Sequence, residues 1–380
     1  MKELSIGVIG SGGRGAVARE LHNNEKLGTK IVACCDKNES TLETNKEWYG
    51  SSVFTTTDYK KLLALKPDAV FVCTPDFMHE EHVLAALNAG IPVYLEKPMA
   101  ITIQGCDKIL KKVKDTGVKL FVGHNMRYMN IMQKMKQMVD KGMVGTVKSI
   151  WCRHFVSYGG DAYFRDWHSE RKNTTGLLLQ KGVHDIDMIH WFSGKYTKRV
   201  SAFGALSVYG DLPRRKSDKV PTVSFDQANY PPSALSGFSQ VIDVEDQNAV
   251  IMDMGDGVIC SYLQCHFAPD ACRNYTIIGT EGKLENIGDG PEDPIFLWNK
   301  RKDRYRMIGD EVFYGDSIKA GSHGGSDNNI VSDFIDMIRN NVKTIATPEA
   351  ARMAVAVGCQ ATASLRNNGQ PMDIPEIKID

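Results

Sequence analysis

The chain has 380 residues, enough for two domains with substantial cores. Its 46 Lys and Arg residues balance its 46 Asp and Glu residues, so no net field would attract nucleic acid or an anionic membrane surface. Hydrophobic residues make up 42% of the chain, as in ordinary globular proteins, and no apolar run approaches the roughly 20 residues that span a bilayer.

The first predicted strand and the cysteines both indicate the cytoplasm. That strand begins near residue 4, so we expect no signal peptide. The nine cysteines are an odd number, and most lie in apolar segments. Reduced thiols are the simplest interpretation.

The first forty residues predict a strand, a glycine-rich turn, a helix and a second strand. The apolar run Leu4–Ile9 is typical of a parallel strand covered on both faces. The segment Gly10-Ser11-Gly12-Gly13-Arg14-Gly15 follows, with glycines in the G-x-G-x-x-G spacing. A helix is expected over Ala16–Asn23 and a strand over Lys30–Cys35. This order indicates a dinucleotide-binding fold.

The glycines of this turn have separate predicted roles. Gly10 permits the tight turn, Gly12 lets the backbone approach a pyrophosphate, and Gly15 lets the helix pack closely on the strand. Backbone N–H groups at the start of the helix would point at the phosphates. We therefore expect the cofactor to contact Gly10, Gly12, Gly13, Arg14 and Gly15.

Asp36 ends the second strand, 21 residues after Gly15. This spacing matches that of the acid that binds the ribose 2′-hydroxyl in dinucleotide folds. A carboxylate there would repel a 2′-phosphate, which favours NAD over NADP. The neighbouring Lys37 weakens that preference.

Strands and helices continue to alternate as far as residue 123, which predicts a parallel, doubly wound sheet. We expect strands near Ser52–Phe54 and over Asp68–Cys73, Ile91–Leu95 and Lys119–Gly123, and helices over Tyr59–Leu65 (capped by Asp58), His79–Ala89 and Thr102–Thr116. Ligands of such sheets bind beyond the carboxyl ends of the strands. That rule selects Gly10, Asp36, Thr74, Pro75, Glu96, Lys97 and Asn125.

The sequence predicts no metal site. His79 and His82 are three residues apart, whereas a helical zinc pair needs four, so an exposed first helical turn is the better interpretation. Cys260, Cys265, His266 and Cys272 form a loose cluster without C-x-x-C spacing, and its cysteines are interpreted as strand thiols.

Four segments resemble the glucose–fructose oxidoreductase / inositol dehydrogenase / MocA family. They are Glu96-Lys97-Pro98, Cys73-Thr74-Pro75 with His79, Gly123-His124-Asn125-Met126-Arg127-Tyr128, and Gly182-Val183-His184-Asp185-Ile186-Asp187. The resemblance implies an α/β protein with an N-terminal Rossmann domain and a C-terminal α/β domain. It also places His79 beside the cofactor.

We therefore assign residues 1–125 to an NAD-binding Rossmann domain and residues 126–380 to a substrate-binding and oligomerisation domain. The second domain would carry a large, mostly antiparallel sheet. Because one face of this sheet would be available to pair with another copy, we expect a homodimer or a homotetramer. Strands are expected over Val147–His154, Arg199–Tyr209, Asp246–Met254, Gly257–His266 and Arg273–Gly279, and helices over Ser326–Asn340 and Pro348–Arg366. In this family the final helix commonly packs back toward the nucleotide domain.

The resemblance also implies an active site. Oxidising a secondary alcohol needs a hydride acceptor, supplied by nicotinamide, and a base for the hydroxyl proton. His184 is the predicted base, and Lys97 would donate to the reacting oxygen or exchange the proton itself. The alternatives are a core histidine on a helix and a solvated lysine at a strand end.

One residue departs from the family pattern. Many dehydrogenases of the family carry Asp four residues before the histidine, one turn away on the same helix face, and here that residue is Gln180. An amide binds a sugar hydroxyl but takes no proton, so inositol dehydrogenase is a doubtful closest model. Lys181 either adds a charge at the pocket rim or is solvated.

Aromatic and hydrogen-bonding residues near residue 165 suit a carbohydrate substrate. Arg165 and Trp167 are predicted pocket residues or, equally, loop anchors. His323 in His323-Gly324-Gly325 either completes the pocket or sits in a turn that Ser326 or Asp327 caps.

The leading hypothesis is an NAD-dependent oxidoreductase acting on a sugar, a glycoside or a polyol. The alternative is a glycosidase that retains NAD and cleaves by oxidation, elimination and re-reduction, because the glycine turn and His323-Gly324-Gly325 resemble that branch. A non-catalytic NAD sensor is a third class, against which Lys97 and His184 argue.

Overall fold

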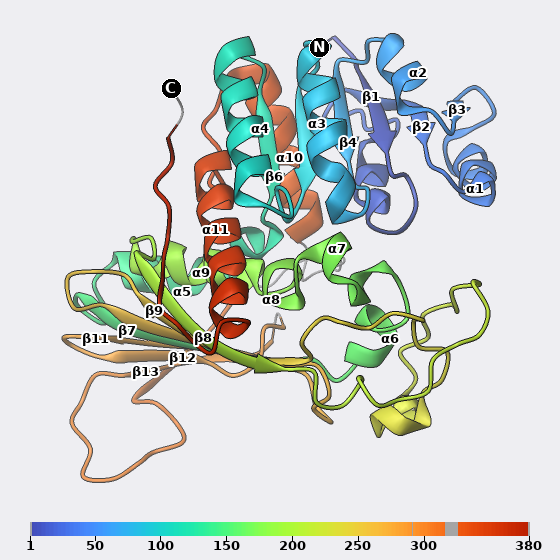
Figure 1. The fold of residues 1–380 in the computed structure, drawn as a ribbon. Helices are drawn as coiled ribbons and strands as arrows, with labels where there is room; N and C mark the ends of the chain where they lie inside the picture. The colour runs from blue at the N-terminus through green and yellow to red at the C-terminus, as the bar shows by residue number, and fades with distance from the viewer. Residues whose placement is uncertain (1, 291, 316–325, 379–380) are drawn as a thin grey trace. The chain divides into compact units, whose positions relative to one another are not determined.

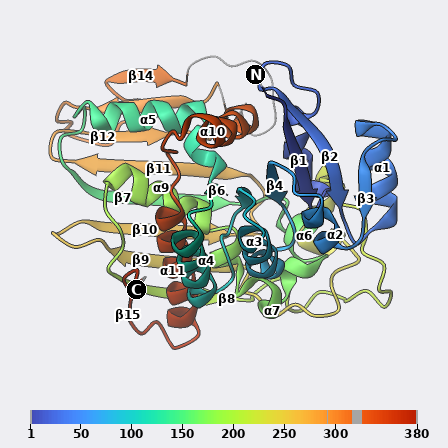
Figure 2. The same ribbon diagram turned by 90° about the horizontal axis from the view of Figure 1, so that it is seen from above.

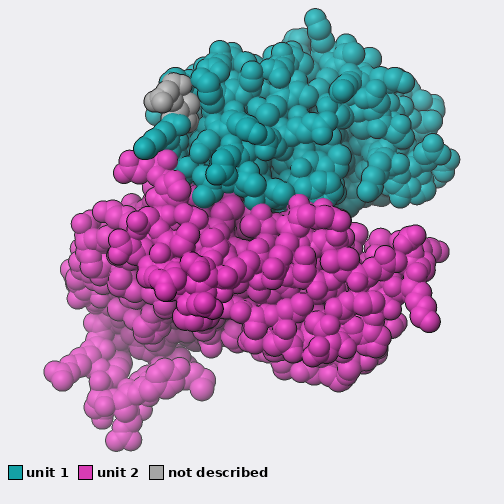
Figure 3. Space-filling view, viewed as in Figure 1, with its two compact units in different colours: residues 1–128, 321–352, 377–380 teal, residues 129–320, 353–376 magenta. Residues whose placement is uncertain are grey.

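The computed structural model describes residues 2–290, 292–315 and 326–378. The chain separates into two compact units, coloured separately in Figure 3. Unit 1 contains residues 1–128, 321–352 and 377–380, and unit 2 contains residues 129–320 and 353–376. Within the described ranges, every helix is too short or too polar to span a bilayer.

Unit 1 is built on a six-stranded sheet with the order β3-β2-β1-β4-β5-β6. All five strand pairs are parallel. The predicted doubly wound sheet is thereby confirmed. The strands are β1 (Leu4–Ile9), β2 (Thr29–Cys35), β3 (Phe54–Thr56), β4 (Ala69–Val72), β5 (Val93–Glu96) and β6 (Leu120–Gly123).

The helices of unit 1 agree with the predictions where local capping is strong. In α4, the Thr102 side chain accepts from the Gly105 N–H, and Gly117 ends the helix in the left-handed conformation. Asp58 caps α2 as predicted. The helices are η1 (Gly13–Leu21), α1 (Glu39–Tyr49), α2 (Tyr59–Ala64), η2 (Asp76–Met78), α3 (His79–Asn88), α4 (Ile103–Thr116), η3 (Asn125–Tyr128) and α10 (Ser326–Asn340).

Three local predictions in unit 1 need correction. The segment after the glycine turn is a 3₁₀ helix that begins at Gly13, three residues before the predicted start. Helix α1 was not predicted, since only Leu42, Asn45 and Tyr49 of its residues are buried. Strand β3 lies two residues later than expected.

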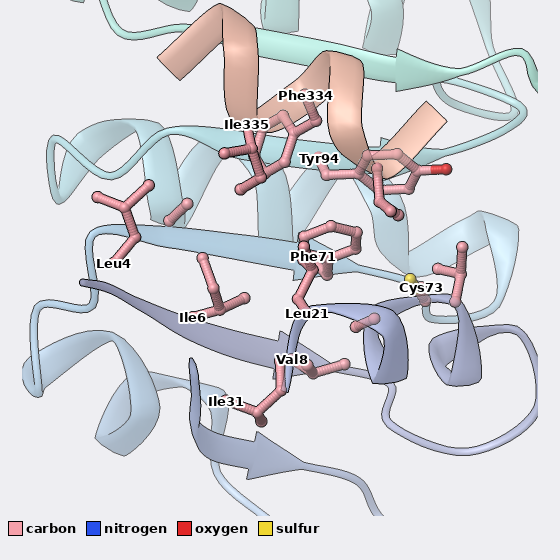
Figure 4. Close-up of a cluster of buried hydrophobic side chains, with 14 of the residues drawn as sticks. Leu4, Ile6, Val8, Leu21, Ile31, Phe71, Cys73, Tyr94, Phe334 and Ile335 are labelled. Atoms are coloured by element: carbon pink, nitrogen blue, oxygen red, sulfur yellow. The ribbon is translucent and has the colours of Figure 1, made fainter. Parts of the chain in front are cut away.

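Helix α10 completes the core of unit 1, although it comes some 200 residues after the sheet in the sequence. Its Phe334 ring packs edge-on against Phe71 at 5.2 Å, Tyr94 at 5.7 Å and Phe121 at 5.8 Å between ring centroids. Figure 4 shows Phe334 and Ile335 pointing toward these strands. Burial of several aromatic rings is a large stabilising contribution.

Unit 2 is built on a nine-stranded sheet with the order β14-β13-β12-β11-β7-β10-β9-β8-β15. Its pairs are antiparallel except β7 with β10, which confirms the mostly antiparallel prediction. The strands are β7 (Val147–Phe155), β8 (Arg199–Ala205), β9 (Gln247–Asp253), β10 (Ile259–Cys265), β11 (Cys272–Gly279), β12 (Lys283–Asn286), β13 (Pro294–Trp298), β14 (Glu311–Tyr314) and β15 (Met372–Asp373).

Strand β8 ends four residues before the predicted Tyr209. The reason is the Asp246 carboxylate, which accepts from the backbone N–H groups of Ser207, Val208 and Tyr209 and so takes them out of the ladder. Strands β9 and β10 form an antiparallel hairpin, with positive φ at Gly255, Asp256 and Gly257 in its turn.

Helices cover one face of the unit 2 sheet, as Figures 1 and 2 show for α5, α9 and the part of α11 in this unit. The helices of unit 2 are α5 (Asn130–Asp140), α6 (Gly159–Tyr163), η4 (Trp167–Ser169), α7 (Arg171–Thr174), α8 (Leu177–Gln180), α9 (Val183–Ser193), η5 (Gln227–Asn229) and η6 (Pro232–Ala234). Helix α11 (Pro348–Leu365) crosses the division between the units at Arg352.

The opposite face of this sheet presents large apolar side chains to solvent. Strand register places Ile251 opposite Ser261, which in turn lies opposite Trp151, so the three share a face. The exposed fractions of Trp151, Phe203, Ile251, Ile259 and Leu263 lie between 41% and 64%. We call these five residues the apolar sheet face.

A buried carboxylate, Asp185 of α9, ties that helix to the sheet. Its oxygens lie 2.9 Å from His154 Nδ1, 3.0 Å from the Tyr262 hydroxyl and 3.1 Å from Arg273 Nε, and they also accept from the Tyr275 hydroxyl. These contacts outweigh the burial and hold the pKa of Asp185 well below its usual range. Burial, reinforced by Arg273, lowers the pKa of His154 to about 4.

This network predicts a pH dependence of stability. His154 is neutral when folded and protonates more readily when unfolded, so stability falls as the pH drops from the unfolded pKa near 6.5 toward 4. His154 alone should contribute about 2 kcal/mol to the loss of stability between pH 7 and pH 5. Urea unfolding of wild type and His154→Gln at both pH values measures it. The variant should lose about 2 kcal/mol less than wild type over that interval, and an equal loss would contradict the assignment.

Candidate functional site

The glycine turn of unit 1 is tight on its inner side and open on its outer side. Gly10 has φ of +80°, and a Cβ on Gly15 would lie 2.2 Å from the Gly10 carbonyl oxygen. A Cβ on Gly13, by contrast, would meet no atom within 4 Å. Close packing where the helix meets the strand and free space outside the turn are what a bound pyrophosphate requires, so the chain fits a dinucleotide.

Asp36 lies at the carboxyl end of β2, with its carboxylate beside the glycine turn. One oxygen accepts from the Gly12 N–H at 3.0 Å, and the other accepts from the Asn38 N–H at 3.0 Å. Each carboxylate oxygen has a second lone pair. The side chain is half-buried, so it retains capacity for ribose hydroxyls.

The Arg14 guanidinium bonds two carboxylates within unit 1. Its Nε donates to Glu96 at 2.8 Å, and its terminal nitrogens donate in parallel to the two oxygens of Asp327, each at 2.8 Å. The Tyr94 hydroxyl also donates to Glu96, at 3.1 Å. Arg14 therefore links the glycine turn to the end of β5 and the start of α10. The sequence suggested Asp327 only as a cap of a turn and gave no sign of its pairing with Arg14, which lies 313 residues away.

The ends of β4 and β5 are joined by a buried histidine. His79 Nδ1 lies 2.7 Å from the Pro98 carbonyl oxygen, and Nε2 lies 2.8 Å from the Thr74 carbonyl oxygen. Burial lowers the pKa of His79, and these two contacts partly offset that effect. His82 is also buried and lies 3.1 Å from the Thr74 hydroxyl. The expectation of an exposed helical turn is therefore wrong.

These contacts bring together the candidates of unit 1. Thr74 and Pro75 follow β4, Lys97 follows Glu96 at the end of β5, and the buried Asn125 follows β6. Lys97 is half-buried. All lie at the carboxyl edge of the parallel sheet, where such sheets bind their ligands.

The candidates of unit 2 lie in two places. Gln180 and His184 are both buried at the junction of α8 and α9. The sequence predicted that both residues lie on one helix face. The structure places them on two helices, because α8 ends at Gln180 and α9 begins at Val183. A Cβ on Gly182 would lie 2.3 Å from the Leu178 carbonyl oxygen, so this junction requires glycine.

Arg165 and Trp167 have contacts typical of loop anchors. Arg165 Nη1 lies 3.9 Å from Asp161 Oδ1 and donates to the Thr222 carbonyl at 3.4 Å. The Trp167 ring stacks on His168 with centroids 3.7 Å apart. Their predicted role in a pocket stays a prediction. His323 lies outside the described residues.

The described parts of the chain contain no group of three His, Cys, Asp or Glu side chains placed to hold a metal ion. The cysteines of the loose cluster lie in or beside strands, and burial raises the pKa of Cys260 to about 12. A neutral, buried thiol is a poor metal ligand.

Comparison with known proteins agrees with this geometry. Residues 4–124 match the family model for the oxidoreductase family with an NAD-binding Rossmann fold, and residues 136–374 match the model for the C-terminal α/β domain of that family. The putative oxidoreductase YteT of Bacillus subtilis is 28% identical over 336 residues, which cover 77% of this chain and 78% of the relative.

Two further relatives are inositol dehydrogenases. An inositol 2-dehydrogenase/D-chiro-inositol 3-dehydrogenase of Halalkalibacterium halodurans is 30% identical over 222 residues, 58% of this chain and 61% of the relative. The myo-inositol 2-dehydrogenase structure from Lactobacillus plantarum superposes with a TM-score of 0.75 at 23% identity, covering 98% of this chain and 100% of that one, which shows the shared fold. The chain thus belongs to the Gfo/Idh/MocA oxidoreductase family, with an NAD-binding Rossmann fold and a C-terminal α/β domain.

Proposed function

We propose that the chain is an NAD-dependent dehydrogenase that oxidises a secondary alcohol of a sugar, a glycoside or a polyol. The observation that carries the proposal is the position of Lys97 after Glu96, at the carboxyl edge of the sheet beside the glycine turn. Glu96 is held by Arg14 and Tyr94, so the backbone before Lys97 is anchored on both sides. When bound, NAD supplies the hydride acceptor.

Lys97 and His184 handle the proton in this proposal. A lysine ammonium donates to the reacting oxygen and stabilises its developing negative charge. An imidazole such as that of His184 removes the hydroxyl proton near neutral pH. Gln180 hydrogen-bonds a substrate hydroxyl from the residue that precedes the helix break.

Replacing either proton-handling residue should slow turnover strongly without unfolding the chain. We expect kcat to fall by about 10²-fold or more in Lys97→Met and in His184→Asn, because general acid–base groups contribute about that much. NADH absorbance with a panel of sugars, polyols and aryl glycosides measures it. Lys61→Met, an exposed lysine of α2, serves as the matched control. Wild-type turnover in Lys97→Met would refute both enzymatic hypotheses.

The second candidate is a redox-neutral glycosidase that keeps its NAD. The glycine turn with Arg14 favours it through the family resemblance, and Gln180 replaces the acid of many dehydrogenases. The same assay separates the two candidates when released aglycone is recorded together with NADH. Lasting NADH without aglycone identifies the dehydrogenase, and aglycone without lasting NADH identifies the glycosidase.

Asp36 should make the enzyme prefer NAD. Replacing its carboxylate with Asp36→Ser removes acceptors for the ribose hydroxyls and the repulsion of a 2′-phosphate. We expect NAD to bind about tenfold more weakly, since a hydrogen bond to a charged group contributes about 1.5–3 kcal/mol, while NADP binds more tightly than to wild type. Fluorescence titration with both cofactors tests this. Glu43→Ser on the exposed side of α1 should change neither affinity.

We further propose that the apolar sheet face joins two copies of the chain. Contiguous exposed apolar side chains mark interaction surfaces, and these five come from four neighbouring strands of one sheet. Wild type should be a dimer or tetramer by light scattering, and Trp151→Asp should reduce the molar mass. Tyr305→Asp, in the exposed loop after β13, should not. A monomeric wild type, or a variant of unchanged mass, contradicts this assembly.

A further inference from the structure

Lys181 occupies the helix break between the two proposed substrate residues of unit 2. Gln180 precedes it, and His184 follows three residues later. The break is a close approach of the backbone that only a glycine at position 182 allows, so Lys181 lies in a packed junction between α8 and α9 rather than in a surface loop. Its side chain is half-buried, whereas Lys172 on the nearby α7 is largely exposed and pairs with Glu170 at 2.7 Å.

The charge of Lys181 has no direct counterion within the described residues. No carboxylate of the described chain lies within 4.0 Å of its ammonium. Its charged and titratable neighbours are Tyr158, His154, His266, Arg273, Asp185 and Asp289. The two acids among them already pair with Arg273: Asp185 at 3.1 Å and Asp289 at 3.2 Å. The Asp185 carboxylate also has three further hydrogen-bonding partners in the sheet.

One aromatic ring, that of Tyr163, lies beside this ammonium group. Its nitrogen lies 5.7 Å from the Tyr163 ring centroid, within the range of a cation–π contact. The same ring packs edge-on against His266 at 5.1 Å. His266 is fully buried, and neither of its ring nitrogens has a hydrogen-bond partner among the described residues. Two polar groups around one tyrosine thus lack hydrogen-bonding partners within the described chain.

We propose that Lys181 binds a carboxylate of the substrate, so that the enzyme acts on an acidic sugar such as a uronate or its glycoside. This inference rests on the proposed carbohydrate site. A monoanion fits because one cation is without a direct partner, whereas a phosphate dianion would need more positive charge than this site offers. Gln180 fits as well, because a carboxylate in its place would repel an acidic substrate.

The pKa of Lys181 agrees with this assignment. Burial lowers the pKa of its ammonium group, and the surrounding charges of both signs leave that lowering in place. A substrate carboxylate in direct contact would stabilise the charged form again. Burial of the pair against Tyr163 would strengthen the attraction relative to an exposed pair.

The test is a comparison of binding to acidic and neutral sugars, independent of turnover. Calorimetry in the presence of NADH measures the affinities of glucuronate, galacturonate and mannuronate against glucose, galactose and mannose. Wild type should prefer at least one acid about 10- to 100-fold over its neutral partner, which corresponds to about 1.4–2.7 kcal/mol for a direct charge pair. The methyl ester of that acid should bind like the neutral sugar.

The protein-side variants separate a charge contact from a structural role. Lys181→Met should remove the preference for the acid, Lys181→Arg should retain most of it, and Lys172→Met should leave it unchanged. No acid preference in any wild-type pair, or an undiminished preference in Lys181→Met, overturns the proposal. The ester comparison uses unmodified protein, so it holds even where a variant fails to fold. The preferred acid is then incubated with NAD in place of NADH: acid-selective binding without NADH formation supports this proposal and contradicts the dehydrogenase.

Discussion

The constraint on which unit 1 depends is the close approach of two backbone segments at the glycine turn. The start of η1 lies so near β1 that a single methyl group at Gly15 would lie 2.2 Å from the Gly10 carbonyl oxygen. Because the helix can sit this close, the Arg14 side chain reaches the end of β5, and the Asp36 carboxylate reaches the Gly12 N–H. A bulkier turn would separate these groups, and the carboxyl edge of the sheet would no longer be one connected site.

The main constraint in unit 2 is a buried charge, the Asp185 carboxylate of helix α9. Asp185 is satisfied by donors from β7, β10 and β11, and this arrangement anchors the helix that carries His184. Breaking such a buried pair is strongly destabilising, since the remaining charge is left uncompensated. Lys181 differs from Asp185 in that the described chain provides no such partner. Asp185, four positions after Lys181, is thus a charge used for structure, whereas we propose that the charge of Lys181 binds a ligand.

Local signals accounted for the predictions that succeeded. Thr102 begins α4 and Gly117 ends it through contacts within a few residues of each. The glycine spacing determined the turn after β1. The contacts that could not be predicted from the sequence join residues far apart along the chain. Nothing near Arg14 indicates that its partner is Asp327, and the donors to Asp185 come from strands up to 90 residues away. Helix α1 was missed because its buried face is narrow and includes a polar residue.

The placement of α10 also bears on how the chain is made. Phe334 fills the space beside Phe71, Tyr94 and Phe121, but it leaves the ribosome more than 200 residues after Phe121. At the usual 5–20 residues per second, that interval is roughly 10–40 s. During this time the nascent sheet of unit 1 lacks the helix that covers its aromatic residues. A chaperone that binds exposed aromatic surface would therefore find its substrate during translation, before roughly the last seventh of the chain exists.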